Sequence, residues 1–342
     1  MENYKIKELK PLPKNPFISI IIPFHWGLLP ENNNRFLKDF NRFLKLDYKK
    51  YEIILVSDKQ VKIPFKSKKI KYLVTRANHA TSPAEKRDFA LPKVKGEISV
   101  FIDDDAYPAP DWLTKAIRHF SHLMIVAVGG PGVTPPSDGY WEKLGGAILE
   151  SYFCSGKLLY RYYQVPKWIT VDDYPAYNLF IRTDVLRKVG GFNSTFYYGE
   201  DTRVCIELVK YGKILYDHEV LVYHHRRAFP KHHLKQIWNT GVHRGFFVKK
   251  YPQTSKRWIY FLPITLTIGL FGSISLSLYK PHYFILPTTL LFVFFWLLGS
   301  YSIAKRGKDL KISLMGGIGV ILSHITYGVG FVKGLYQKEL LR

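Results

Sequence analysis

Continuous apolar runs of strand length alternate with helical patterns over the first two-thirds of the sequence. The apolar runs cover residues 17–23, 52–58, 70–74 and 97–102. Helical spacing of apolar residues is found at 33–46, 82–91 and 112–120, and we expect two later helices at 183–189 and 201–211. Runs this apolar suit strands that are covered on both faces of a sheet. The alternation therefore predicts an α/β domain with a mostly parallel, Rossmann-like sheet.

Acidic residues follow two of these predicted strands. Asp58 ends the second apolar run, and Asp103, Asp104 and Asp105 come directly after the fourth. Ligands of open α/β sheets bind at the carboxyl ends of the strands. Three adjacent carboxylates repel one another unless a cation sits among them, and their hard oxygens suit Mg²⁺ or Mn²⁺. The sequence therefore predicts a divalent-metal site of the kind that holds a diphosphate.

A second acidic pair, Glu200 and Asp201, stands where a helix is expected to begin. Carboxylates are favoured there by the helix dipole, so the pair could be no more than helix-start residues. The alternative is a general base. We expect the dipole to hold Asp201 ionised, as a base requires.

The charge balance bears on partners. Lys and Arg number 50 against 27 Asp and Glu, which gives a formal charge of +23. Nucleic acid, an anionic membrane surface and phosphorylated substrates would each attract such a chain. The basic residues gather before the apolar C-terminal part, and no zinc-finger or RNA-binding signature occurs, so we expect a membrane and no nucleic acid. The two cysteines form no CxxC motif and are expected to be reduced thiols of the cytoplasm.

Three apolar segments close the sequence, at about 258–279, 282–303 and 312–335, and none contains Asp or Glu. Each is near the ~20 residues that cross a bilayer. Basic residues precede the first segment and fill the loop between the second and third, which predicts a cytoplasmic α/β domain by the positive-inside rule. A tilted or re-entrant third segment is the alternative. The predicted domains are a basic arm (1–16), the α/β domain (17–228), an amphipathic interfacial segment (229–257) and a transmembrane region (258–342).

The order of the motifs resembles family-two glycosyltransferases of the GT-A fold, in the bacterial and archaeal branch with a C-terminal membrane part. The matching motifs are Ile20-Ile21-Ile22-Pro23, the strand ending in Asp58, Lys86-Arg87-Asp88, Asp103-Asp104-Asp105, Gly190-Gly191-Phe192 and Gly199-Glu200-Asp201. The resemblance covers residues 17–228 in detail. It implies inverting transfer of a sugar from a nucleotide-diphosphate sugar to a lipid-linked or glycan acceptor at the plasma membrane.

The resemblance also implies roles for individual residues. Asp201 would be the catalytic base, with Glu200 positioning it or the acceptor. Asp105 and Asp103 match the Asp-x-Asp motif and would hold Mg²⁺ or Mn²⁺. The residues implied for nucleotide-sugar binding are Pro23, Asp58, Arg87, Asp103 and Asp104, and those implied on the acceptor side are Gly130, Asn178 and Trp238.

The sequence departs from the family at two places. Ser57 stands where relatives have the first of two acids, and Gln236-Ile237-Trp238 lacks the family's Arg-Trp pair, which counts against a processive synthase. For residues 224–227, His-His-Arg-Arg, we expect a basic patch that faces the diphosphate or lies near the membrane, and not a zinc site, because no Cys or acidic partner lies at ligand spacing. Residues 129–178 show no clear period and are expected to form an irregular acceptor site or lid.

Three alternatives to this function stay open. The first is a polyprenyl-phosphate glycosyltransferase. Its phosphate acceptor is already ionised and needs no general base, so the presence of the acidic pair favours a hydroxyl acceptor. The second is a nucleotide-sugar nucleotidyltransferase, which needs a Gly-rich phosphate-binding loop after the first strand. Residues 23–27 contain only one glycine, which disfavours this alternative. A transporter or scaffold with a decayed domain is disfavoured because the acidic motifs are intact.

Overall fold

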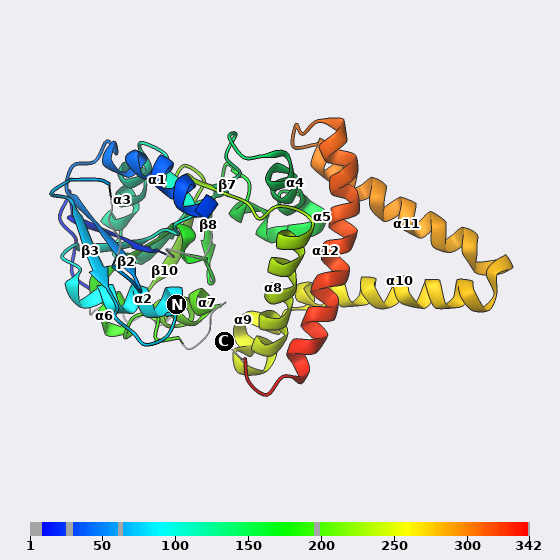
Figure 1. Ribbon diagram of the computed structural model, residues 1–342. Helices are drawn as coiled ribbons and strands as arrows, with labels where there is room; N and C mark the ends of the chain where they lie inside the picture. Colours follow the sequence, from blue (N-terminus) through cyan, green and yellow to red (C-terminus); the bar gives the residue numbers. More distant parts are fainter. Residues whose placement is uncertain (1–8, 25–29, 61–63, 195–198, 341–342) are drawn as a thin grey trace. The chain divides into compact units, whose positions relative to one another are not determined.

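The computed structural model describes residues 9–24, 30–60, 64–194 and 199–340 (Figure 1). Residues 1–8 of the predicted basic arm lie outside these ranges. The chain divides into two compact units, one formed by residues up to 133 together with 164–224, the other by 134–163 together with 225–341. The predicted domain boundaries stay predictions.

The first unit is built on an eight-stranded sheet with the strand order β3-β2-β1-β4-β9-β6-β10-β8. Its strands are β1 (Ile18–Pro23), β2 (Tyr51–Ser57), β3 (Ile70–Val74), β4 (Ile98–Phe101), β6 (Ile125–Gly129), β8 (Trp168–Val171), β9 (Leu179–Arg182) and β10 (Lys213–Asp217). Strand β1 pairs in parallel with β2 and β4, β2 with β3, and β6 with β10, whereas β9 and β8 run antiparallel to their neighbours. The predicted mostly parallel sheet is confirmed.

The remaining elements of this unit support the sheet. The helices are α1 (Pro30–Leu44), α2 (Pro83–Ala90), α3 (Trp112–Ile117), α6 (Thr183–Lys188) and α7 (Glu200–Leu208), and a small second sheet has the order β5 (Ala106–Pro108), β11 (Val222–His224), β7 (Gly132–Val133). Every residue of β1 and β2 is buried, as continuous apolar runs require. Helix α2 begins with a capping box, in which Ser82 accepts from the Glu85 amide and the Glu85 side chain accepts from the Ser82 amide.

The second unit is helical. It contains α4 (Tyr140–Leu149), α5 (Tyr152–Ser155), α8 (Lys231–Lys250), α9 (Pro252–Ser255), α10 (Leu262–Tyr279), α11 (Pro281–Ala304) and α12 (Leu310–Tyr336). The prediction of an irregular segment at 129–178 is wrong where α4 forms. Gly145 and Gly146 lower the helix propensity of this segment, so its sequence does not read as a helix. In the structure α4 packs its apolar side on α12, where Ile148 lies against Gly319.

Three helices of this unit are long and apolar enough to cross a membrane: Trp258–Tyr279, Pro281–Ala304 and Leu310–Tyr336. These bounds agree with the three segments predicted from the sequence. The helices differ in packing, since half of the third is buried within the structure against 11% of each of the other two.

Candidate functional site

The candidate site begins at the carboxyl ends of three adjacent parallel strands, β2, β1 and β4. Pro23 ends β1 and pairs in register with Val56 of β2, and Ile21 pairs with Phe101 of β4. Asp58 and Asp103 follow their strands within two residues of these positions. The sheet therefore brings the predicted nucleotide-binding residues to one edge, as expected for a doubly wound α/β domain.

Asp58 is held by three side chains at this edge. Its Oδ1 accepts hydrogen bonds from Thr75 Oγ1 (3.0 Å) and Thr81 Oγ1, and its Oδ2 accepts one from Lys86 Nζ (2.9 Å). Burial alone would raise the pKa of Asp58, but the bonds from Thr81 and Lys86 outweigh it and hold the pKa below its usual value. Asp58 is thus an ionised, oriented carboxylate at neutral pH.

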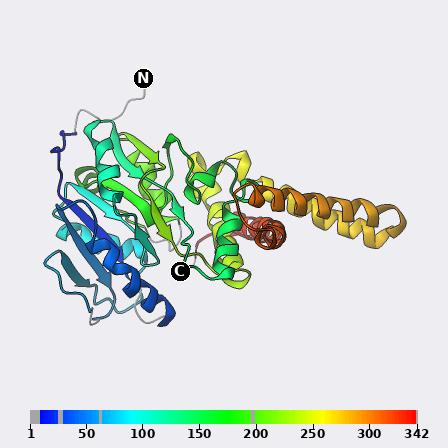
Figure 2. The ribbon, with the colours of Figure 1, turned by 90° about the horizontal axis from the view of Figure 1, so that it is seen from above.

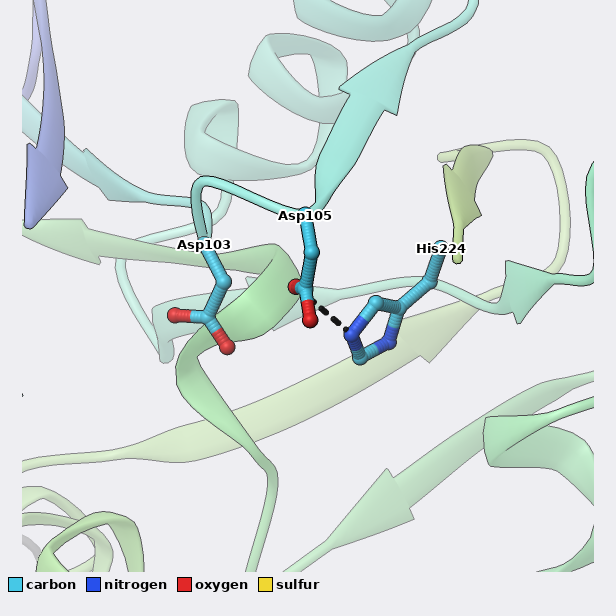
Figure 3. A group of neighbouring side chains, drawn as sticks. All are labelled: Asp103, Asp105 and His224. Atoms are coloured by element: carbon cyan, nitrogen blue, oxygen red, sulfur yellow. Dashed lines mark ion pairs between the residues drawn. The ribbon is translucent and has the colours of Figure 1, made fainter. Parts of the chain in front are cut away.

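A potential metal site lies beyond the carboxyl end of β4. One ligand atom each from Asp103, Asp105 and His224 lies within 4.8 Å of the other two. Figure 3 shows the Asp105 carboxylate facing the His224 imidazole, with the Asp103 carboxylate next to them; the Asp105 Oδ1 to His224 Nε2 distance is 3.0 Å. Two carboxylates and an imidazole form a donor set that fits Mn²⁺ and similar divalent ions. Asp104 is not part of this group.

His224 reaches the aspartates through strand pairing. It is the last residue of β11, which pairs antiparallel with β5 so that His224 stands opposite Ala106, the neighbour of Asp105. The Tyr177 ring lies 4.8 Å from the imidazole, centroid to centroid. Sequence reasoning missed His224 because it sought partners at local spacing, whereas Asp105 is more than a hundred residues away.

Arg87 joins the metal-site aspartate to the second acidic pair. Its Nη2 donates to Asp103 Oδ1 (2.8 Å) and its Nη1 to Glu200 Oε1 (3.1 Å), and Nη1 is 3.7 Å from Asp201 Oδ1. The Arg87 side chain is only 3% exposed. We call Asp103, Glu200 and Asp201 the carboxylate cluster. Since the guanidinium is occupied by this cluster, the predicted contact of Arg87 with the nucleotide stays a prediction.

The Gly-Gly-Phe motif forms a turn anchored on Asp88. The backbone amides of Phe192 and Asn193 each donate to this carboxylate at 2.7 Å. Gly191 has φ +75°, and a Cβ there would come within 2.3 Å of Asp88 Oδ1, so only glycine fits without rearrangement. Gly199, with φ +81°, precedes Glu200 at the start of α7. These glycines explain how the chain turns to present the acidic pair.

The ionisation of the acidic pair differs from the expectation. Burial and repulsion from Glu200 raise the pKa of Asp201 well above its usual value, although Arg87 opposes the rise, and burial also raises the pKa of Glu200. Burial thus shifts the pKa of Asp201 in the direction opposite to the one expected from the helix dipole, and the role of Asp201 as an ionised base stays a prediction. Among the described residues, no hydrogen-bond donor reaches the buried Asp201 Oδ1.

Of the three residues predicted for the acceptor side, Gly130 and Asn178 are in contact within the first unit. Asn178 is fully buried, where its amide accepts from Trp112 Nε1 (2.8 Å) and donates to the carbonyls of Gly130 and Val220 (2.7 Å each). At Gly130 a Cβ would lie 1.8 Å from the Val220 carbonyl oxygen. Trp238 lies on α8 in the second unit. The Asn178 side chain thus joins the segment after β6 to the segment before β11. An acceptor role for Gly130, Asn178 and Trp238 stays a prediction.

Replacing Arg87 with methionine is expected to destabilise the first unit by about 3–5 kcal/mol, because the carboxylate cluster would lose its buried cation. The pKa values of Glu200 and Asp201, which burial already raises, would then rise further, because Arg87 opposes the rise in the parent chain. The folded state would bind more protons than the unfolded state, so the variant's stability should recover as pH falls from 8 towards 5. Apparent melting temperatures of the full chain in detergent with chelator would measure this. Glu207→Gln, a surface ion-pair carboxylate on α7, is the control; a deficit in R87M that is independent of pH would contradict the prediction.

Comparisons with known proteins point to one family. Residues 19–190, half of the chain, match the model of glycosyl transferase family 2. Pre-mycofactocin glycosyltransferases from two strains of Mycobacterium tuberculosis are each 29% identical over 151 residues, 44% of this chain and 31% of theirs. The chain thus matches about a third of the length of these curated relatives.

A solved structure shares the fold. The mannosyltransferase PcManGT from Pyrobaculum calidifontis, in complex with GDP-Man and Mn²⁺, superposes with a TM-score of 0.60 at 16% identity, covering 97% of this chain and 91% of that one. At this identity the likeness concerns the fold. The match over half the chain, the mostly parallel sheet and this shared fold together show that the chain belongs to glycosyltransferase family 2, with a GT-A fold followed by apolar C-terminal helices.

Proposed function

We propose that the chain is an inverting, metal-dependent glycosyltransferase that moves a sugar from a nucleotide-diphosphate sugar to a hydroxyl group of a membrane-associated acceptor. The observation that carries this proposal is the double contact of Arg87. One buried guanidinium binds Asp103 of the metal-ligand group and also Glu200 of the acidic pair. A site for the donor's diphosphate and a candidate base for the acceptor are therefore coupled through a single side chain.

Asp103, Asp105 and His224 would hold the divalent ion. A bound ion would neutralise charge on the departing nucleotide diphosphate. The oxygen ligands suit Mg²⁺ or Mn²⁺, and the imidazole favours Mn²⁺ because Mg²⁺ prefers oxygen ligands. The structural neighbour's complex with GDP-Man and Mn²⁺ supports this assignment. Pro23, Asp58, Arg87 and Asp104 are proposed to line the nucleotide-sugar pocket around it.

Asp201 would accept the proton of the acceptor hydroxyl. A base works best when its pKa is close to the operating pH, and burial moves the pKa of Asp201 in that direction. Its Oδ1 accepts no hydrogen bond from the described residues, so this oxygen would be the one that binds the acceptor hydroxyl. The hydroxyl oxygen would attack the anomeric carbon from the face opposite the diphosphate, which inverts the configuration. Glu200 would fix the position of Asp201 or of the acceptor, and Gly130, Asn178 and Trp238 are proposed to support the acceptor side.

The apolar helices support a membrane location for the acceptor, lipid-linked or glycan. We propose a multi-pass protein of the plasma membrane, with its α/β unit on the cytoplasmic side because the basic loops flank the apolar segments there. A polyprenyl-phosphate acceptor is the second candidate. The candidate base at Asp201 favours a hydroxyl acceptor over it.

The test is a screen of nucleotide sugars with the full chain in detergent, with Mn²⁺, Mg²⁺ or excess chelator. The true donor should raise the apparent melting temperature only with metal, because it binds the folded state. Sugar transfer to lipid and glycan acceptors should require the same ion, and NMR of the product should show an inverted anomeric centre. Equal transfer under saturating chelator, or a retained configuration, would refute the proposal.

A further inference from the structure

Length and composition qualify three helices as membrane spans, but their packing separates them into two kinds. The buried residues of α10 are Thr267 and Leu270, and those of α11 are Gly299, Ser300, Ser302 and Ile303, near its end. Beyond these positions the two helices are apolar and open on nearly all sides, a state that requires lipid around them. Between them, Ser277 Oγ and Thr288 Oγ1 lie 2.7 Å apart, so their polar side chains are satisfied inside the pair.

Helix α12 meets this hairpin at its base. Near its start, the Leu314 carbonyl accepts from Trp296 Nε1 in the second half of α11 (2.9 Å). Further along, the Phe331 ring lies 5.0 Å from the Phe261 ring, next to the start of α10. Helix α12 thus passes from the end of α11 to the start of α10. Figures 1 and 2 show it running across the base of the hairpin and not alongside it.

The other sides of α12 are covered by protein. Glycines of α12 and α8 bring the two backbones together, since a Cβ at Gly334 would lie 2.0 Å from the Val242 carbonyl oxygen and one at Gly245 would lie 2.1 Å from that of Phe331. Helix α4 covers another part, around Gly319. Half of α12 is buried in this way, far more than in either helix of the hairpin.

Between its terminal residues Leu310 and Tyr336, which are exposed, α12 exposes one apolar stripe with a lysine near each end. The members of the stripe are Ile318, Leu322, Val329 and Val332, at spacings that return to one face of a helix. The flanking residues Lys311 and Lys333 are exposed as well. One apolar stripe flanked by lysines is the pattern of a helix that lies in the headgroup region, where anionic lipids attract the basic residues.

We propose that the chain crosses the bilayer only twice, through the α10–α11 hairpin, and that α12 lies in the membrane plane with its exposed stripe against the lipid. Helix α12 contacts both ends of the exposed apolar hairpin, through Trp296 and Phe261, so we assign the bilayer around the hairpin as the occupant of the stripe as well. The segment Trp258–Tyr279 has 22 residues, or ~33 Å of helix at ~1.5 Å per residue, which matches a ~30 Å hydrocarbon core. Exposed Trp258 at the base and Tyr279 and Tyr283 at the tip mark its two interfaces. This topology does not depend on the proposed chemistry.

The first test is the side of the membrane on which each loop lies. Exposed Lys280, Lys305 and Lys338 are replaced one at a time by cysteine in the full chain. Spheroplasts and inside-out vesicles of a bacterial host are then treated with a membrane-impermeant PEG-maleimide, with the parent chain as the background for Cys154 and Cys205. K305C and K338C should react in the same preparation and K280C only in the other. Reaction of K338C together with K280C would mean three crossings, and reaction of K280C together with K305C would mean no crossing by the hairpin; either result overturns the proposal.

The second test measures depth. Ile318 and Val329 are replaced by cysteine in a chain carrying Cys154→Ser and Cys205→Ser, labelled with NBD and reconstituted in phosphatidylcholine–phosphatidylglycerol vesicles that contain shallow or deep spin-labelled lipids. An in-plane α12 places both labels at one shallow depth, whereas a spanning α12, whose middle is residue 323, would place both within ~9 Å of the bilayer centre. Leu290, exposed in the middle of α11, is the deep control. Labels as deep as the Leu290 control, or labels that no lipid quenches because a second copy covers them, would overturn the proposal.

Discussion

Replacing Asp105 with asparagine should lower the rate of sugar transfer about a thousandfold. The change removes one of two charged ligands from the group of Asp103, Asp105 and His224. Charge stabilisation by a bound metal contributes several kcal/mol to such reactions, and about 4 kcal/mol corresponds to this factor. The turnover number at saturating donor, measured over a Mn²⁺ titration, would show the loss together with a weaker apparent metal affinity. Asp111→Asn, at a carboxylate that makes no capping hydrogen bond, is the matched control.

His224 gives a finer test of the same site. His224→Asp would turn the donor set into three carboxylates, so the ratio of activity with Mg²⁺ to activity with Mn²⁺ should rise. His224→Ala should weaken Mn²⁺ binding without that change in preference. If D105N kept its rate within threefold of the parent chain, or if both His224 variants retained the parent's metal affinity, the metal site would have to lie elsewhere.

Asp201→Asn is expected to lower the turnover number by about 10²- to 10⁴-fold, the usual contribution of a general base. Donor binding should be unchanged, because Asp201 is assigned to the acceptor side of the reaction. Thermal stabilisation by donor and Mn²⁺ would measure binding, and transfer assays would measure turnover. Glu207→Gln, on the same helix, controls for the loss of a carboxylate from α7.

The pH profile separates a base from a structural carboxylate. The base acts when it is ionised, so the rate should increase as pH rises through the pKa of Asp201, which burial raises well above its usual value. In D201N this acidic limb should disappear from kcat/KM between pH 5 and 8. A variant that keeps the limb, or that loses donor binding together with turnover, would remove Asp201 from the role of base.

The sequence was sufficient for the features that depend on local patterns. Apolar runs and capping residues predict β1, β2, β4 and α2, and the position of Asp103 after a buried strand predicts a site at the sheet edge. It was insufficient where a property arises from distant partners. His224 joins the aspartates only through the register of β5 and β11. The raised pKa of Asp201 comes from burial and from the nearby charges of Glu200 and Asp103, and the contact with Asp103 is not evident from local spacing.

One turn of α2 carries three successive side chains that bind different parts of the site: Lys86 holds Asp58, Arg87 holds the carboxylate cluster and Asp88 holds the Gly-Gly-Phe turn. Successive helix residues point about 100° apart, so the three directions are fixed relative to one another. Chimaeric enzymes made by exchanging segments between relatives should therefore retain this turn together with all three of its targets. A transplant that brings in the turn from one parent and the targets from another would misalign donor and acceptor subsites at once, even where each segment is well formed in its own parent.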